Sequence, residues 1–111
     1  MSAPKLNRKM VLEELVRVPD GMGGFLESWN AKGALWVNLD ARGASEKQVG
    51  ARRLPVMKFK IISRAAPFGA ASRPRPDQRF REGARRFDIL AVGEYDAAGQ
   101  YLEIWAEEGR Q

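Results

Sequence analysis

The chain has 111 residues, of which 44% are hydrophobic and 30% are charged, a balance typical of one globular domain rather than of a disordered segment. It contains no cysteine and no histidine, which excludes disulfides, Cys/His zinc sites, thiol nucleophiles and histidine bases. No metal or other cofactor is expected. No stretch approaches the ~20 apolar residues of a membrane helix, so no membrane partner is expected. Without a histidine base or a carboxylate pair placed to share a substrate, we do not expect an enzyme.

The charges divide the chain into three segments. Residues 1–41 carry 5 basic and 5 acidic groups, residues 42–86 carry 13 basic and 3 acidic groups, and residues 87–111 carry 1 basic and 6 acidic groups. The net charges are therefore 0, +10 and −5. Three interpretations are open: a surface that binds nucleic acid, self-assembly of the basic face of one copy with the acidic face of the next, or an unevenly charged surface in solvent.

In chain order, residues 1–8 lack an apolar pattern and are expected to form a flexible N-terminal segment. Residues 10–18 fit a helix or a strand, because their apolar residues satisfy both periods. The segment 19–24 predicts a turn, in which Gly21, Gly23 and Gly24 supply positive φ angles without steric cost. Residues 34–39 alternate as a half-buried strand. Residues 41–54 lose this alternation and predict a long basic loop with one helical turn near 45–49, capped by Ser45.

The second half of the chain continues with strands and turns. Residues 56–63 alternate as a strand, residues 65–78 predict a proline-rich loop, and Gly83-Ala84 predicts a hairpin between strands over 78–82 and 85–92. A turn at 96–99 leads into a last strand over 101–106. About six short strands predict one all-β domain over 1–111, a small antiparallel β-barrel or sandwich with long loops. The expected core is Leu35, Val37, Met57, Phe59, Phe87, Ile89, Leu102 and Ile104.

Two basic loops and two tryptophans are the candidates for binding. Trp36 and Trp105 lie opposite the core faces of their strands, and we expect them to pack against a loop or to form a subunit interface. Arginine and lysine side chains in flexible loops can contact phosphates without reading sequence. The basic candidates are Arg42, Lys47, Arg52 and Arg53 in the first loop, and Arg73 and Arg75 in the second.

Several motifs follow one another in a recognisable order over about residues 8–108. The order begins with Asp20-Gly21-Met22-Gly23-Gly24, followed by Trp29, and continues through the strand 35–39 and the glycine-containing segment 43–46. It ends with the strand 86–92 and a hairpin over 96–107. Together these motifs resemble the head-tail joining proteins of tailed bacteriophages, also called head completion or stopper proteins, which have relatives in gene transfer agents. The resemblance implies a small β-barrel with long loops, in which residues 10–18 form a strand.

The resemblance also implies a structural neck protein of a phage, a phage remnant or a gene transfer agent, assembled in the bacterial cytoplasm and located in the particle. Such a protein forms a homo-oligomeric ring of sixfold or twelvefold symmetry, closes the DNA-filled head and docks the tail. Its expected partners are the portal or adaptor ring, the tail terminator or tail tube, and packaged double-stranded DNA, contacted non-specifically. The 42–53 loop is then expected to face the channel or the adjoining ring. The alternatives are a small β-barrel module that binds nucleic acid and a tail-terminator ring protein.

Overall fold

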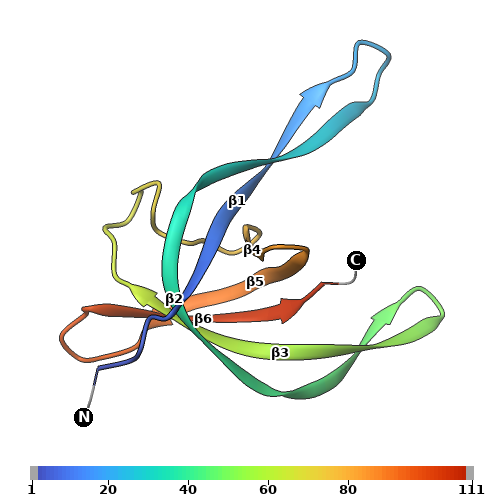
Figure 1. Cartoon of the computed structure of the whole chain (residues 1–111). Coiled ribbons are helices and arrows are strands. Elements are labelled where there is room, and N and C mark those ends of the chain that lie inside the picture. Colours follow the sequence, from blue (N-terminus) through green and yellow to red (C-terminus); the bar gives the residue numbers. More distant parts are fainter. Residues whose placement is uncertain (1–2, 110–111) are drawn as a thin grey trace.

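The computed structural model describes residues 3–109, which form six strands and, within that range, no helix that could span a membrane. All neighbouring strands are antiparallel, and the order β1-β2-β3-β6-β5-β4 closes into a barrel through the pairing of β4 with β1 (Figure 1). The prediction of an all-β barrel of about six strands is therefore confirmed, and residues 10–18 are a strand. The bounds are β1 Arg8–Pro19, β2 Phe25–Val49, β3 Arg52–Arg64, β4 Arg79–Glu82, β5 Arg85–Glu94 and β6 Tyr101–Glu108.

The core fills the inside of the barrel with alternating apolar residues from all six strands. At its centre the rings of Phe59 and Phe87 meet edge to face, with 5.2 Å between their centroids. Six of the eight predicted core residues are buried, and Leu35 is partly buried against the same cluster. The buried residues that the prediction missed come mainly from β1 and β4. The apolar residues of these two strands do not follow a pattern that assigns them to the core. The buried cluster consists of Met10, Leu12, Val37, Phe59, Ile61, Phe80, Phe87, Ile89, Leu102, Ile104 and Ala106.

Two β-hairpins extend well beyond the barrel (Figure 1). Strand β2 has 25 residues and takes part in both hairpins. Its first half pairs with β1, and its second half pairs with β3. The radius of gyration is 15.3 Å, whereas a compact domain of this length has about 13 Å. We call residues 15–29 of the β1–β2 hairpin the apolar arm, and residues 42–57 of the β2–β3 hairpin the basic arm.

A β-bulge lies at the base of each arm. One bulge falls between Leu12 and Glu13 and leaves Lys32 as the extra residue, next to Gly33 with a φ angle of 144°. The other falls between Ala41 and Gly43 of β2 and leaves Arg42 as the extra residue. Gly43 has a φ angle of 125°. Bulges bend the strand and increase its twist. These two therefore mark where each two-stranded ribbon leaves the barrel wall.

The prediction of a long basic loop over 41–54 is wrong, as is the helical turn at 45–49. These residues continue β2 and β3, joined by the two-residue turn Gly50-Ala51, in which Gly50 has a φ angle of 61°. A positive φ angle at this position is typical of tight hairpin turns. Met57 was expected in the core but is 39% exposed. It lies one residue beyond Lys58, the first residue of β3 that pairs with β6, and so belongs to the arm.

Candidate functional site

The tip of the apolar arm is built around the carboxylate of Asp20. Its Oδ1 accepts hydrogen bonds from the backbone N–H groups of Met22 (2.7 Å) and Gly24 (3.0 Å). Gly21 and Gly23 have φ angles of 82° and 85°, in the left-handed region that favours glycine. The positive φ angles predicted for Gly21 and Gly23 are confirmed, and the one predicted for Gly24 is wrong. At Gly24 glycine is favoured for a different reason, because a Cβ atom there would lie 2.8 Å from Oδ2 of Asp20.

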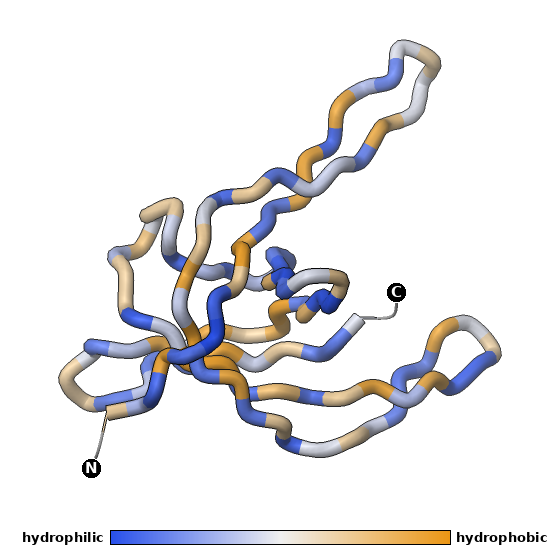
Figure 2. Tube along the Cα trace, in the orientation of Figure 1, coloured by the Kyte–Doolittle hydropathy of each residue, from blue (hydrophilic) through white to orange (hydrophobic). Residues whose placement is uncertain are grey.

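Large hydrophobic side chains surround this turn and are exposed. Val18, Met22, Phe25 and Leu26 are each at least half exposed, and Met22 reaches 87%. Figure 2 shows hydrophobic residues along much of the length of this arm, far from the barrel core. The binding residues expected from the sequence are basic residues and tryptophans, and they do not include these side chains. Val18, Phe25 and Leu26 lie next to the glycine turn in the sequence. Apolar residues beside such a turn have no core to enter, and this position could have identified them as an exposed surface.

A buried charge cluster holds the base of the apolar arm against the barrel. The Glu13 side chain is 7% exposed and accepts hydrogen bonds from Nε of Arg79 (2.7 Å) and Nε of Arg81 (2.9 Å). The Arg79 guanidinium also stacks on the Trp29 ring, with its carbon 3.9 Å from the centroid. Burial raises the pKa of Glu13, but the hydrogen bonds and charges of the two arginines outweigh burial and lower it below its usual value. Trp29, part of the sequence motif, thus joins arm and barrel.

The basic arm carries its charges in three different environments. Arg42, at the bulge, pairs with Asp40 at 3.4 Å, and Arg53 pairs with Glu46 at 3.5 Å, both on exposed side chains. Exposed pairs of this kind contribute little to stability and leave the guanidinium accessible. Arg52 lies opposite Val49 and is exposed. The net charge of residues 42–57 is +3, from four basic and one acidic residue.

Lys47 differs from the other three basic residues, because its ammonium group is directed at the barrel. Its Nζ lies 2.5 Å from Oε1 of Glu107 on β6, and the hydrogen bond to Glu107 raises the pKa of Lys47. Asp88 on β5 lies directly opposite Glu107. Burial, and secondly the charge of Glu107, raise the pKa of Asp88. Lys47 is therefore the counter-ion of a carboxylate pair rather than a free charge.

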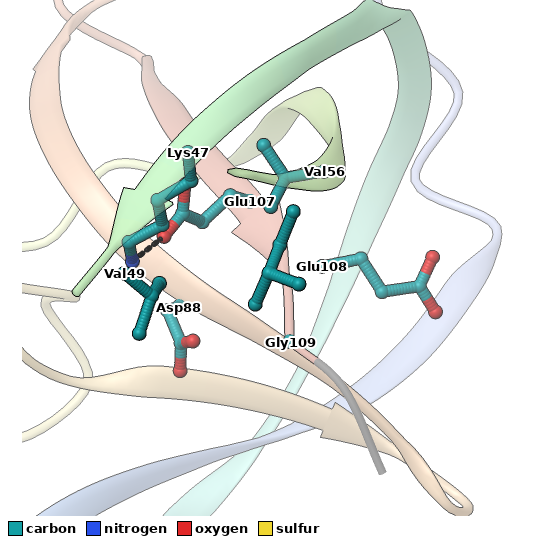
Figure 3. Close-up of a pocket in the computed structure, with 8 residues that line it drawn as sticks. Lys47, Val49, Val56, Asp88, Glu107, Glu108 and Gly109 are labelled. Atoms are coloured by element: carbon teal, nitrogen blue, oxygen red, sulfur yellow. Dashed lines mark hydrogen bonds and ion pairs between the residues drawn. The ribbon is translucent and has the colours of Figure 1, made fainter. Parts of the chain in front are cut away.

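A groove of about 200 Å³ separates the basic arm from the barrel (Figure 3). Lys47 crosses it to reach Glu107, as the dashed line in Figure 3 shows. Apolar side chains of the arm form one wall, and acidic side chains of β5 and β6 form the other. Its lining consists of Lys47, Val49, Leu54, Val56, Asp88, Glu107, Glu108 and Gly109.

The other predicted site residues lie apart from the two arms. Residues 65–78 form an irregular segment, as expected. Within it, Arg73 donates to the carbonyl of Ala66 at 2.9 Å, and Arg75 forms an ion pair of 2.6 Å with Glu14 of β1. Both arginines therefore have partners inside the molecule. Trp36 and Trp105 are both exposed, so the interface expected for them stays a prediction.

The two arms are the features of this structure most suited to binding another macromolecule. The described part of the chain contains no group of three or more acidic residues placed to hold a metal ion. What it presents instead is two arms of different character, one apolar with a net charge of −1 over residues 15–29 and one basic. Exposed hydrophobic clusters are typical of surfaces that bind other macromolecules.

Comparison with known proteins relates this architecture to viral particles. A chain in the virion of a native gene transfer agent (GTA) particle is 53% identical, with a TM-score of 0.84, and the match covers 96% of this chain and 98% of that one. Protein SF1141 from Shigella flexneri 2a, known from a solution structure, shares the fold, with a TM-score of 0.68, 21% identity and coverage of 98% and 97%. No curated protein matches. The model of one family, described as phage head completion protein, matches residues 1–109. The chain therefore belongs to the phage head completion protein family.

Proposed function

We propose that the chain is the structural neck protein of a tailed phage or a gene transfer particle. In this role it forms a ring that closes the DNA-filled head and offers a docking surface to the tail. The observation that carries the proposal is the match of almost the whole chain, at 53% identity, to a chain of a gene transfer agent virion. The family described as phage head completion protein supports the same assignment to the head of the particle.

The two arms support a role in assembly. A subunit of a ring needs one surface for each neighbour, and a subunit below a DNA-filled head needs positive charge where DNA passes. The apolar arm supplies a protein-binding surface. The basic arm supplies exposed guanidinium groups for sequence-independent contact with phosphates. Portal or adaptor proteins on one side and tail proteins on the other are the partners that such a ring requires.

Deletion of this chain from a producing strain tests the proposal. Negative-stain imaging should then show heads without tails, and wild-type protein supplied from a plasmid should restore tailed particles. Overlong or unfinished tails on closed heads would instead indicate a tail terminator. Tailed particles of normal appearance and titre would contradict a structural role in the neck.

A further inference from the structure

The outer side of the barrel carries two exposed tryptophans on one continuous sheet face. Trp36 of β2 is 56% exposed, and Trp105 of β6 is 37% exposed. Strand β3 lies between these two strands, and its residue Ile62 points outward because its neighbours Ile61 and Ser63 are buried inside the barrel. Ile62 is nevertheless only 4% exposed, so side chains of the outer face cover it. We call the surface marked by Trp36, Ile62 and Trp105 the tryptophan face.

Basic residues border Trp36 on both sides. Lys9 of β1 lies directly opposite Trp36. On the other side, the register of β2 with β3 places Arg64 next to Trp36 on the same face. Lys5 lies at the edge of this face, because its carbonyl oxygen accepts a hydrogen bond of 3.0 Å from Nδ2 of Asn38. All three basic residues are exposed, so the indole is the centre of a basic area.

The positive charges around Trp36 are available to a partner. Among residues 3–109, no carboxylate lies within ion-pair distance of Lys5, Lys9 or Arg64. Glu103 and Asp40 lie further along the tryptophan face, and each forms an ion pair with a basic residue of its own, at 3.6 Å and 3.4 Å. The area around Trp36 therefore carries positive charge that the chain itself does not balance.

An exposed indole among unpaired cations favours a protein partner over DNA. Tryptophan and arginine are enriched among the residues that contribute most to the stability of protein interfaces. Contacts with the phosphates of duplex DNA use lysine, arginine and small polar groups, and would leave Trp36 without a role. Unpaired positive charge favours a surface of the opposite sign. The surface that fits the area around Trp36 is therefore an acidic protein surface.

A second copy of this chain does not supply such a surface. Nine of its fourteen acidic residues form ion pairs with basic residues of the same chain. Asp20 and Asp96 accept hydrogen bonds from backbone N–H groups. The others are Asp77, Asp88 and Glu94, and the first two line a cavity that also contains two basic side chains. The described residues thus hold no cluster of free carboxylates that matches three cations.

We propose that the area around Trp36 docks on an acidic surface of a different protein of the particle. Trp36 is the anchor, which loses its contact with solvent, and Lys9 and Arg64 pair with carboxylates of the partner. Because these two cations come from strands on either side of β2, a carboxylate at each one sets the orientation of the contact. The inference rests on the proposed function and names the chemistry of one partner surface.

Zero-length crosslinking tests the chemistry of the contact directly. A carbodiimide activates a carboxylate, which then forms an amide with a lysine amine that touches it. Purified tailed particles are treated with the reagent, and mass spectrometry identifies both ends of every link from Lys9. The expected result is an amide between Lys9 and an aspartate or glutamate of another particle protein. Lys9→Arg is the matched control, because it keeps the charge but has no reactive amine, so tailed particles should form without this link.

Two results of this experiment would overturn the proposal. A link from Lys9 to a second copy of the chain would show that the face joins identical subunits. The absence of any link from Lys9 in tailed particles would show that no carboxylate of a partner touches it.

Charge reversal tests the same contact in assembly. Lys9→Glu/Arg64→Glu changes two exposed side chains, so the isolated variant should melt like the wild type. The chain should be lost from particles, and replacement of the linked carboxylate of the partner by lysine should restore it. Trp36→Ala should cause the same loss, whereas Phe68→Ala, at an aromatic ring that is 87% exposed in another part of the surface, should not. If the double reversal enters tailed particles at wild-type copy number and lowers only their nuclease-protected DNA, the face contacts DNA and the proposal is wrong.

Antibody labelling separates a failure of this inference from a failure of the neck function. If the wild-type chain lies at the junction of head and tail but Lys9 forms no link, the docking proposal is wrong while the neck function stands. If the chain lies away from that junction, the neck function is wrong, and the inference fails with it.

Discussion

Asp88 and Glu107 lie directly opposite each other on β5 and β6, two carboxylates on adjacent strands of the barrel wall. Like charges at opposed positions of a sheet repel each other and destabilise the pairing. The ammonium group of Lys47, from the basic arm, lies 2.5 Å from Glu107. Lys47 therefore reduces the repulsion between the two carboxylates. Because Lys47 belongs to the basic arm, the position of this arm depends on the charges of Asp88 and Glu107.

The raised pKa of Asp88 makes a prediction about stability and pH. Because the pKa is higher in the folded state than in the unfolded state, ionisation of Asp88 lowers the free energy of unfolding. This loss is complete above the raised pKa and disappears as the pH falls below about 3.9, the ordinary value for aspartate. Asp88→Asn should therefore have a higher melting temperature than the wild type at pH 7, with a difference that shrinks toward pH 3.

Thermal unfolding followed by circular dichroism over this pH range measures the difference. Asp40→Asn, at a half-exposed side chain of β2, is the matched control and should change the melting temperature little at any pH. A lower melting temperature for Asp88→Asn at pH 7 would show that attraction to Lys47, Arg79 and Arg86 outweighs burial and repulsion.

Glu13 gives the opposite dependence on pH. Its pKa is lowered in the folded state, so its contribution to stability is complete above about pH 4.3 and is lost as the pH falls through the lowered pKa. Glu13→Gln removes the charge that compensates Arg79, whose side chain is only 11% exposed. The expected cost is at least about 2 kcal/mol at pH 7. Urea titrations at pH 7 and pH 3 measure it, and a cost that does not shrink at the lower pH would contradict the ion-pair explanation.

The barrel could be predicted from the sequence because burial leaves a period-two pattern. Val37, Phe59 and Ile104 alternate with polar neighbours and lie inside the barrel. The same rule failed for the basic arm, since both faces of a two-stranded ribbon in solvent can be polar and no alternation arises. Residues 43–49 are strand because they pair with 52–58 across the Gly50 turn, and pairing of this kind leaves no hydrophobic signature.

The candidate site was predictable only in part, for a similar reason. Charge content identified the segment around Arg42 and Arg53 as basic and exposed. It did not distinguish Lys47, because its partner Glu107 is 60 residues away in the chain and meets it only when β3 pairs with β6. The contact between Trp29 and Arg79 likewise depends on closure of the barrel through β1 and β4.

The core of the barrel should depend strongly on Phe87 and weakly on Met57. Phe87 is completely buried against Phe59, so Phe87→Ala should lower the free energy of unfolding by about 3–5 kcal/mol. Met57 projects from the basic arm and is 39% exposed, so Met57→Ala should cost far less. Chemical denaturation of both variants measures the two costs. Equal costs would contradict the register of β3 or β5, which places Phe87 inside the barrel and Met57 outside it.

The division of charges on the basic arm predicts different outcomes for different reversals. Arg42→Glu/Arg53→Glu should leave the melting temperature nearly unchanged, because exposed charges contribute under about 0.5 kcal/mol each. If these two residues contact packaged DNA, the filled heads should lose nuclease-protected DNA, with a deficit that depends on salt because phosphate contacts are screened. Lys47→Glu, by contrast, places a third carboxylate beside Asp88 and Glu107 and should lower the melting temperature of the isolated chain. Normal DNA content and normal titre for the double reversal would exclude Arg42 and Arg53 from DNA retention and direct attention to Arg52, Arg73 and Arg75.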